Sequence, residues 1–237
     1  MERGRVSASG FEMQVAYRER GTVSAGVALS RDHRPGRTPA VILAPGAGAD
    51  RRHASLAGIQ EGLADAGWTT VTFNFPYREA GRRTPDPRPV LEGCWRAALD
   101  AVRKEPRLAP PWVVIGGRSM GGRIASHVAF DGTDVADVRG LLFFAFPLHP
   151  AGRPGTERAA HLAGITLPML FVQGSRDTLA EPALLATVLR DLRHATLHEI
   201  AGADHSFRVP RRSGRDDASV RAEVIGAATA WLDNLLE

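Results

Sequence analysis

The sequence contains a single cysteine, Cys94, and a single lysine, Lys104, in 237 residues. One cysteine cannot form an internal disulfide bond, so a fold held together by disulfides is excluded. Long hydrophobic runs are also missing, because the longest apolar stretch, residues 141–148, is too short to cross a bilayer. No apolar stretch follows residues 1–5, and we therefore expect no secretory signal. These absences predict a soluble, cytoplasmic protein without a membrane partner.

The charge balance is less basic than the isoelectric point suggests. The sequence pI is about 10.1, yet 30 basic and 26 acidic residues leave a formal net charge of only +4. Nearly all of the basic residues are arginines, whose high pKa raises the isoelectric point. The arginines are scattered along the chain, and neither zinc-ligand spacing nor an aromatic-basic RNA-binding motif is present. We therefore expect a solvated arginine-rich surface and no nucleic-acid partner.

Strand and helix signals alternate almost from end to end, which favours a parallel sheet covered on both faces. An apolar fraction of 43% and a charged fraction of 24% are ordinary for a globular protein with a large core. No internal repeat and no linker interrupts the alternation. The sequence therefore predicts one α/β domain over residues 1–237, with a mostly parallel central sheet flanked by helices.

The expected elements follow from apolar periodicity and turn residues. Strands are expected at residues 12–18, 23–29, 40–43, 69–75, 112–116, 138–144, 169–173 and 196–200, the first two as an antiparallel pair turned at Arg20-Gly21. Helices are expected over residues 56–63, 91–102, 124–128, 184–192 and 220–235, the first of them capped by Asp50. We expect a loop at residues 76–89 and, at residues 147–167, at most a small cap.

The segment Gly117-Arg118-Ser119-Met120-Gly121 lies between an expected strand and an expected helix. A G-x-S-x-G sequence in that context is typical of a nucleophile elbow, a turn so tight that the serine adopts strained backbone angles and projects its hydroxyl above the sheet. Glycine is needed on both sides because a side chain there would collide with the neighbouring strand or helix. A glycine-rich turn with an incidental serine is the alternative.

A serine hydroxyl needs an adjacent base, and the base needs an acid that orients it. Asp177 follows the expected strand at residues 169–173, and His205 follows the strand at residues 196–200. Loops at the carboxyl ends of parallel strands gather at one edge of the sheet, so we expect Ser119, Asp177 and His205 to converge. Asp204 is a rival acid of lower rank. Helix capping by Asp177 and an exposed loop position for His205 are the structural alternatives.

An acyl-transfer site also needs fixed donors for the oxyanion. The backbone N–H of Met120 is one candidate, because it lies at the start of the elbow helix. The second candidate is the N–H of Ala47, in the glycine-rich segment Pro45-Gly46-Ala47-Gly48 after an earlier strand. An ordinary strand-to-helix turn is the alternative for that segment.

Two further groups of residues are candidates for substrate binding. Tyr77 and Arg78, with Arg82 and Arg83, could bind an anionic substrate or pair with neighbouring carboxylates, and the structural interpretation is favoured. The apolar residues could line a modest pocket or belong to the core; they are Phe144, Phe146, Leu148, Leu179 and Phe207.

The motifs resemble those of the α/β-hydrolase fold, in compact proteins similar in size to dienelactone hydrolases. The segments 43–50, 73–79 and 116–123 resemble the branch named for a testis-expressed protein and a histone-acetyltransferase-complex subunit. The resemblance covers residues 20–236 and implies the triad Ser119, Asp177 and His205. Dienelactone hydrolases typically use a cysteine nucleophile, so the serine tells against that activity. Because the branch includes a scaffold subunit, the resemblance alone does not establish turnover.

We therefore expect a serine hydrolase that cleaves a small ester, thioester or related acyl substrate, with a minimal lid or none. The alternative is a hydrolase-shaped interaction module with little or no turnover. No cofactor and no metal is implied. Nothing in the sequence predicts the oligomeric state.

Overall fold

The computed structural model describes residues 9–17 and 21–236. Three expectations concern residues outside the described ranges: the one drawn from residues 1–5, the end of the first expected strand at Arg18, and Arg20 in the first turn. The eight strands form one sheet in the order β1-β2-β4-β3-β5-β6-β7-β8. β1 and β2 pair antiparallel, as do β2 and β4, and all other neighbours are parallel.

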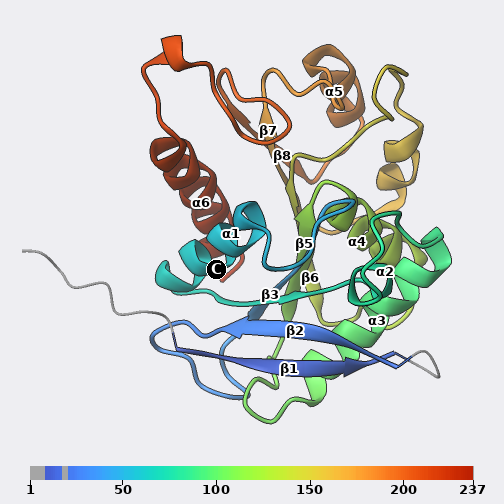
Figure 1. The fold of residues 1–237 in the computed structure, drawn as a ribbon, viewed down its shortest axis with the longest axis vertical. Helices are drawn as coiled ribbons and strands as arrows, with labels where there is room; N and C mark the ends of the chain where they lie inside the picture. The colour runs from blue at the N-terminus through green and yellow to red at the C-terminus, as the bar shows by residue number, and fades with distance from the viewer. Residues whose placement is uncertain (1–8, 18–20, 237) are drawn as a thin grey trace, which may run out of the picture.

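The elements alternate along the chain and are labelled in Figure 1. The strands are β1 (Gly10–Ala16), β2 (Thr22–Ala28), β3 (Ala40–Ala44), β4 (Thr69–Phe73), β5 (Val113–Arg118), β6 (Val138–Phe144), β7 (Met169–Gly174) and β8 (Ala195–Ile200). The α-helices are α1 (Ala54–Asp65), α2 (Pro76–Glu79), α3 (Arg88–Lys104), α4 (Met120–Asp131), α5 (Pro182–Arg190) and α6 (Asp217–Asp233). Two short 3₁₀ helices are η2 (Glu157–Gly164) and η3 (Arg211–Ser213).

The sheet separates two apolar cores, because successive side chains of a strand point to opposite faces. On β5, Val113 and Ile115 pack in the core that contains α3, α4 and α5, whereas Val114 packs in the core that contains α1 and α6. Figure 1 shows α1 and α6 on one side of the sheet and α3 and α4 on the other. The predicted fold class, a mostly parallel sheet flanked by helices, is confirmed.

Several element boundaries differ from the expectations. β4 ends at Phe73, and the segment expected to be a loop contains α2, which begins at Pro76 because proline suits the first turn of a helix. The cap of α1 is His53, whose side chain accepts from the Ser55 N–H, and not Asp50. α5 ends at Arg190, before the expected end at residue 192, and β5 begins one residue later than expected. Within residues 147–167, the only helix that the structure describes is η2.

No helix in the described ranges combines the length and the apolar character needed to span a membrane.

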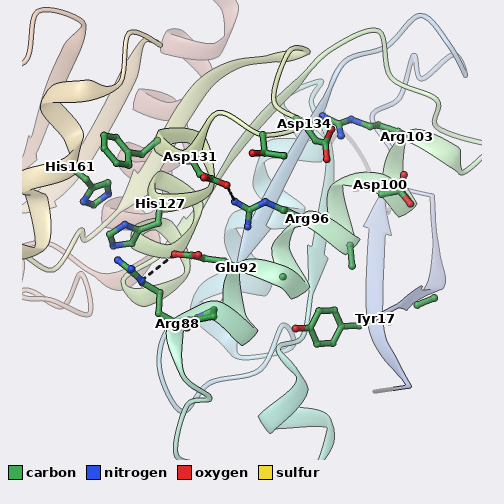
Figure 2. Close-up of a pocket in the computed structure, with 16 residues that line it drawn as sticks. Tyr17, Arg88, Glu92, Arg96, Asp100, Arg103, His127, Asp131, Asp134 and His161 are labelled. Atoms are coloured by element: carbon green, nitrogen blue, oxygen red, sulfur yellow. Dashed lines mark hydrogen bonds and ion pairs between the residues drawn. The ribbon is translucent and has the colours of Figure 1, made fainter. Parts of the chain in front are cut away.

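Two histidines dock η2 against α4. The rings of His127 and His161 are stacked, with 3.7 Å between their centroids. Figure 2 shows the two rings next to each other, with Arg88 close to His127. The Ser126 hydroxyl donates to the Arg123 carbonyl, so its oxygen accepts from His161 Nε2, which fixes the neutral tautomer of that ring. Burial first, and then the charges of Arg88 and Arg123, lower the pKa of His127 to about 4. Burial and the neighbouring His127 lower the pKa of His161 to about 3.

This pair predicts a pH-dependent stability. Because both pKa values lie below the ordinary 6.5, the unfolded chain binds more protons than the folded chain between about pH 6.5 and pH 4. The free energy of unfolding is therefore expected to fall as the pH drops through that window. Urea denaturation at pH 7.5 and pH 5 checks this, and the double variant His127→Gln/His161→Gln should show a smaller loss. An equal loss in both proteins would contradict the assignment.

Candidate active site

Ser119 occupies a strained turn between β5 and α4. Its backbone angles are φ 49° and ψ −115°, a conformation that residues other than glycine rarely adopt. The Ser119 N–H donates to the Phe144 carbonyl at 2.9 Å, which ties the turn to the end of β6. The chain therefore leaves the sheet abruptly, and Ser119 occupies the N-cap position of α4 without a capping hydrogen bond from its side chain.

The glycines of the turn allow it to press against β3. A Cβ added at Gly121 would lie 2.1 Å from the Ala44 carbonyl oxygen, and one at Gly117 would lie 2.3 Å from the same atom. Gly117 also has φ +146°, which disfavours any side chain. Both obstacles are backbone atoms, which cannot move aside as a flexible side chain can. The turn therefore requires glycine at both positions.

The structure brings together the three residues that the sequence predicts as a triad. His205 Nε2 lies 2.9 Å from the Ser119 hydroxyl, and His205 Nδ1 lies 2.7 Å from Asp177 Oδ2. Asp177 follows β7 and is fully buried, whereas His205 follows β8 and is partly exposed. The three side chains come from loops after three different strands and meet at one edge of the sheet. The arrangement can transfer a proton from a hydroxyl to an imidazole that a carboxylate orients.

Asp204, the alternative candidate for the acid, makes other hydrogen bonds. Its Oδ1 accepts from the backbone N–H groups of Ser206 and Arg208, at 2.8 and 3.0 Å. Its own N–H donates to the Arg208 carbonyl. Asp204 therefore shapes the turn that carries His205, and the carboxylate that contacts the imidazole is that of Asp177.

A buried glutamine, Gln173, which was not predicted from the sequence, forms a hydrogen bond with Asp177. Gln173 Nε2 donates to Asp177 Oδ2 at 2.5 Å, and Gln173 Oε1 accepts from the Phe146 N–H at 2.8 Å. The Leu179 N–H donates to the other carboxylate oxygen at 2.8 Å. Both oxygens of Asp177 are thus held before any substrate binds. A polar residue at the end of an otherwise apolar strand was the only signal in the sequence.

The glycine-rich segment after β3 lies against the turn. A Cβ at Gly46 would contact the Ser119 Cβ at 3.5 Å, so this backbone passes directly beside the hydroxyl-bearing residue. Among the hydrogen bonds of the described residues, none uses the N–H of Ala47 or of Met120 as donor. Ala47 is exposed, and Met120 is the first residue of α4, where an N–H has no acceptor within the helix. Both groups are therefore free to donate to a ligand.

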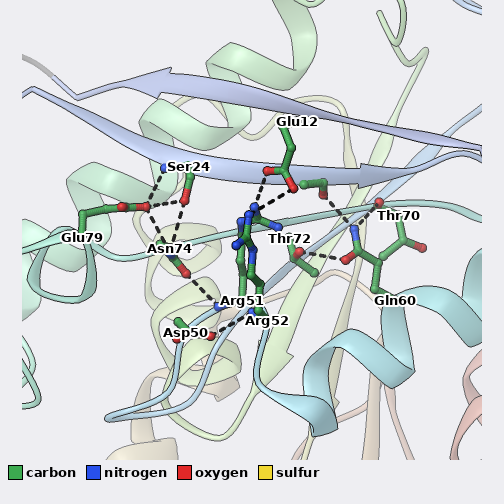
Figure 3. Close-up of polar contacts among 11 residues, drawn as sticks. Glu12, Ser24, Asp50, Arg51, Arg52, Gln60, Thr70, Thr72, Asn74 and Glu79 are labelled. Carbon is green, nitrogen blue, oxygen red and sulfur yellow. Dashed lines mark hydrogen bonds and ion pairs between the residues drawn. The ribbon is translucent and has the colours of Figure 1, made fainter. Parts of the chain in front are cut away.

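A polar network fixes this segment in place. The Gly48 N–H donates to the Tyr77 hydroxyl at 3.0 Å, and the Arg51 N–H donates to Asn74 Oδ1 at 2.7 Å. Figure 3 shows the Arg51 side chain reaching Glu12 on β1. The same side chain passes over Gly26 on β2, where an added Cβ would collide with it. The segment beside Ser119 is thus anchored to the antiparallel edge of the sheet.

The candidates for substrate binding divide by burial. Tyr77 and Phe146 are fully buried, which favours the structural alternative for both over substrate binding: Tyr77 supports the segment after β3, and Phe146 packs against Phe143 and Phe171. Burial also raises the pKa of the Tyr77 hydroxyl. Leu179 and Phe207 are half-buried.

The arginines of the 76–89 segment make local contacts. Arg78 pairs with Asp50 at 3.4 Å and donates to the Arg82 carbonyl at 3.1 Å. Arg82 in turn pairs with Asp86 at 2.6 Å. These contacts support the interpretation that Arg78 and Arg82 pair with neighbouring carboxylates.

A separate hollow of about 1310 Å³ lies between α3 and α4 and is drawn in Figure 2. Its charged side chains largely pair with one another, Arg88 with Glu92 and Arg96 with Asp131. None of the three triad residues lines it. Across the described part of the chain, no group of three or more His, Cys, Asp or Glu side chains is arranged to hold a metal ion.

Comparison with known proteins supports the same fold. A family model described as an alpha/beta hydrolase domain matches residues 37–233. The dienelactone hydrolase of Anabaena variabilis superposes with a TM-score of 0.74 at 18% identity, over 96% of this chain and 98% of that one. An α/β serine hydrolase without lid from Xanthomonas campestris gives 0.68 at 18% identity, over 94% and 95%. Est1E from Butyrivibrio proteoclasticus, with ferulic acid bound, gives 0.72 at 13% identity, over 95% and 100%.

The close approach at the turn predicts a large effect of one methyl group. Gly121→Ala is expected to lower the free energy of unfolding by about 3 kcal/mol or more, because the added Cβ collides with backbone. Gly226→Ala, in α6, is the matched control: an added Cβ there meets nothing within 4 Å, so stability should change by no more than about 1 kcal/mol. Urea denaturation measures both. Equal effects would contradict the packing described.

Proposed function

The chain belongs to the alpha/beta hydrolase domain family, and from that premise we propose that it is a serine hydrolase cleaving a small ester, thioester or related acyl bond. The observation that carries the proposal is the continuous contact from the Ser119 hydroxyl through His205 to Asp177, at 2.9 and 2.7 Å. A serine alone is a weak nucleophile, and this chain of contacts supplies the base that it lacks.

In this mechanism the Ser119 hydroxyl attacks the acyl carbonyl. His205 Nδ1–H donates to Asp177, which leaves Nε2 unprotonated and able to accept the serine proton. Nε2 then returns that proton to the leaving group. A water molecule attacks the acyl-enzyme, again with His205 as base, and releases the acid. Asp177 holds the ring tautomer and stabilises the imidazolium that forms at each step.

The oxyanion is bound by the N–H groups of Met120 and Ala47. Their positions are set before substrate arrives: Met120 by the start of α4, and Ala47 by the hydrogen bonds that fix Gly48 and Arg51, which follow it in the chain. Donors held in this way need no reorganisation as charge develops on the carbonyl oxygen.

The substrate is proposed to be small. Residues 147–167 contain only one short 3₁₀ helix among the described elements, which is little material for a lid over a long acyl chain. Est1E, which shares the fold, was solved with ferulic acid bound, a compact aromatic acid. The finer resemblance to the branch named for a testis-expressed protein belongs to this proposal, as does a cytoplasmic location.

Removal of the nucleophile tests the mechanism. Ser119→Ala should abolish both labelling by a fluorophosphonate probe and turnover of p-nitrophenyl acetate, with a loss in kcat on the order of 10⁶-fold. Asp177→Asn should lower kcat on the order of 10⁴-fold, because the imidazole then loses its carboxylate partner. Urea denaturation verifies that each variant is folded. A folded wild-type protein that neither labels nor turns over would favour the interaction module.

Gln173 is expected to act as a positioning residue. Gln173→Met removes one donor from Asp177 and leaves the side-chain volume nearly unchanged. We expect kcat to fall about tenfold or more, with KM changed by less than about twofold, because the lost hydrogen bond holds the triad and not the substrate. Steady-state kinetics on p-nitrophenyl acetate measure the split. A rise in KM at constant kcat would place Gln173 in substrate binding instead.

A further inference from the structure

A second pocket, of about 360 Å³, lies on the face of the sheet covered by α1 and α6. The start of α1, the segment after His205 and the first turns of α6 enclose it. Its lining contains Ser55, Arg118, Phe207, Arg208, Asp217 and Arg221, with an apolar wall of Ile59, Val220 and Val224. None of the triad residues lines this pocket, so it is distinct from the site around Ser119.

Arg118 places a buried positive charge in the wall of this pocket. Strand alternation explains its direction: Val114 packs toward α1 and α6, and Arg118, four residues later on β5, faces the same side. Only 8% of Arg118 is exposed. Its Nη2 donates to the His205 carbonyl at 2.6 Å, whereas its buried Nε and Nη1 have no hydrogen-bond partner among the described residues.

A buried guanidinium with unused N–H groups is costly unless an acceptor meets it. Burial lowers the pKa of Arg118, and the carboxylates of Asp177 and Asp204 offset that shift only in part. The Phe207 ring centroid lies 5.6 Å from the Arg118 guanidinium carbon, and both residues line the pocket. Phe207 is itself held at φ +57°, an unusual angle for a bulky residue.

Two exposed arginines add to the positive charge. Arg208 and Arg221 line the same pocket, and Arg221 lies across the bare backbone of Gly58 on α1, where an added Cβ would meet its Nε at 3.4 Å. No ion pair joins Arg118, Arg208 or Arg221 to a carboxylate in the part of the chain that the structure describes. Asp217 is the one acidic residue in the lining. The first turn of α1, a helix of 12 residues, also lies at the pocket, although its Ser55 N–H already donates to the His53 side chain.

We propose that this pocket binds a small organic anion, a carboxylate or phosphate group on a short apolar body. The anionic group meets the three arginines and the start of α1, because guanidinium groups donate to both kinds of oxyanion. The apolar body packs on Ile59, Val220 and Val224, which a free inorganic ion would leave uncovered. Contact of the anionic group with Nε or Nη1 of Arg118 requires a local movement, because both nitrogens are buried.

Binding at this pocket acts on the catalytic histidine, a consequence that rests on the proposed function. Arg118 donates to the His205 carbonyl and precedes Ser119 directly in the chain. An anion that holds the guanidinium therefore also holds the segment that carries the imidazole. We expect a saturating anion to alter kcat more than KM for p-nitrophenyl acetate.

The test is isothermal titration calorimetry with benzoate, phenyl phosphate and neutral benzamide. Protein labelled at Ser119 with a fluorophosphonate is used, so that the site around the serine is already filled. Benzoate or phenyl phosphate should bind this protein, and benzamide should bind at least about tenfold more weakly, because it lacks the charge. The unlabelled protein is titrated in parallel, so a failure of labelling counts against the proposed function and leaves the anion test intact.

Variants locate the binding. Arg221→Glu should weaken the charged probes about tenfold or more, whereas Arg193→Glu, the same charge change at an exposed position between α5 and β8, should not. Arg118→Met should also weaken them, and if this variant does not fold, Arg221→Glu decides alone. Equal binding of charged and neutral probes, equal effects of Arg221→Glu and Arg193→Glu, or binding lost on labelling Ser119 would each overturn the proposal.

Discussion

The turn at Ser119 depends on a contact between two backbones. Gly117 and Gly121 let the start of α4 press against the carbonyl of Ala44 at the end of β3. The backbone of Gly46, just after β3, lies beside Ser119. One packing constraint therefore positions Ser119, which we propose as the nucleophile, beside the segment that contains Ala47, a proposed oxyanion donor, and two hydrogen-bonding networks support the site.

One network supports the carboxylate of Asp177, and the other supports the segment after β3. Gln173 joins Asp177 to the Phe146 backbone, so the carboxylate is buried but fully hydrogen-bonded, which a buried charge requires. Tyr77 and Asn74 hold the segment after β3 through its own N–H groups. Gln173 contacts Asp177 directly, whereas Tyr77 and Asn74 contact Gly48 and Arg51 in the segment that contains Ala47. The reacting side chains can thus lie on loops and still be fixed by the core.

The sequence was sufficient for the fold class and for the positions of the three triad residues, because each follows a strongly apolar strand whose carboxyl end must lie at the same edge. The sequence was not sufficient to predict which residues hold these three side chains and the segment after β3 in place. Tyr77 and Phe146 follow strands in the same way, and only the packing of the described structure shows that their side chains turn inward. Gln173 and Arg118 were missed because a single polar residue at the end of a strand has no periodicity that predicts its partner. Two helix starts also differed from the prediction. A short helix begins at Pro76, where a loop was expected, and His53 instead of Asp50 caps α1.

The central claim is that His205 connects Ser119 to Asp177 beside two free backbone donors. The most direct measurement is a crystal structure of the protein after reaction with a fluorophosphonate. The account predicts phosphorus bonded to Ser119 Oγ, a phosphoryl oxygen accepting from the N–H groups of Met120 and Ala47, and the His205 ring still bonded to Asp177. An adduct on another residue, or an imidazole turned away from the carboxylate, would contradict it.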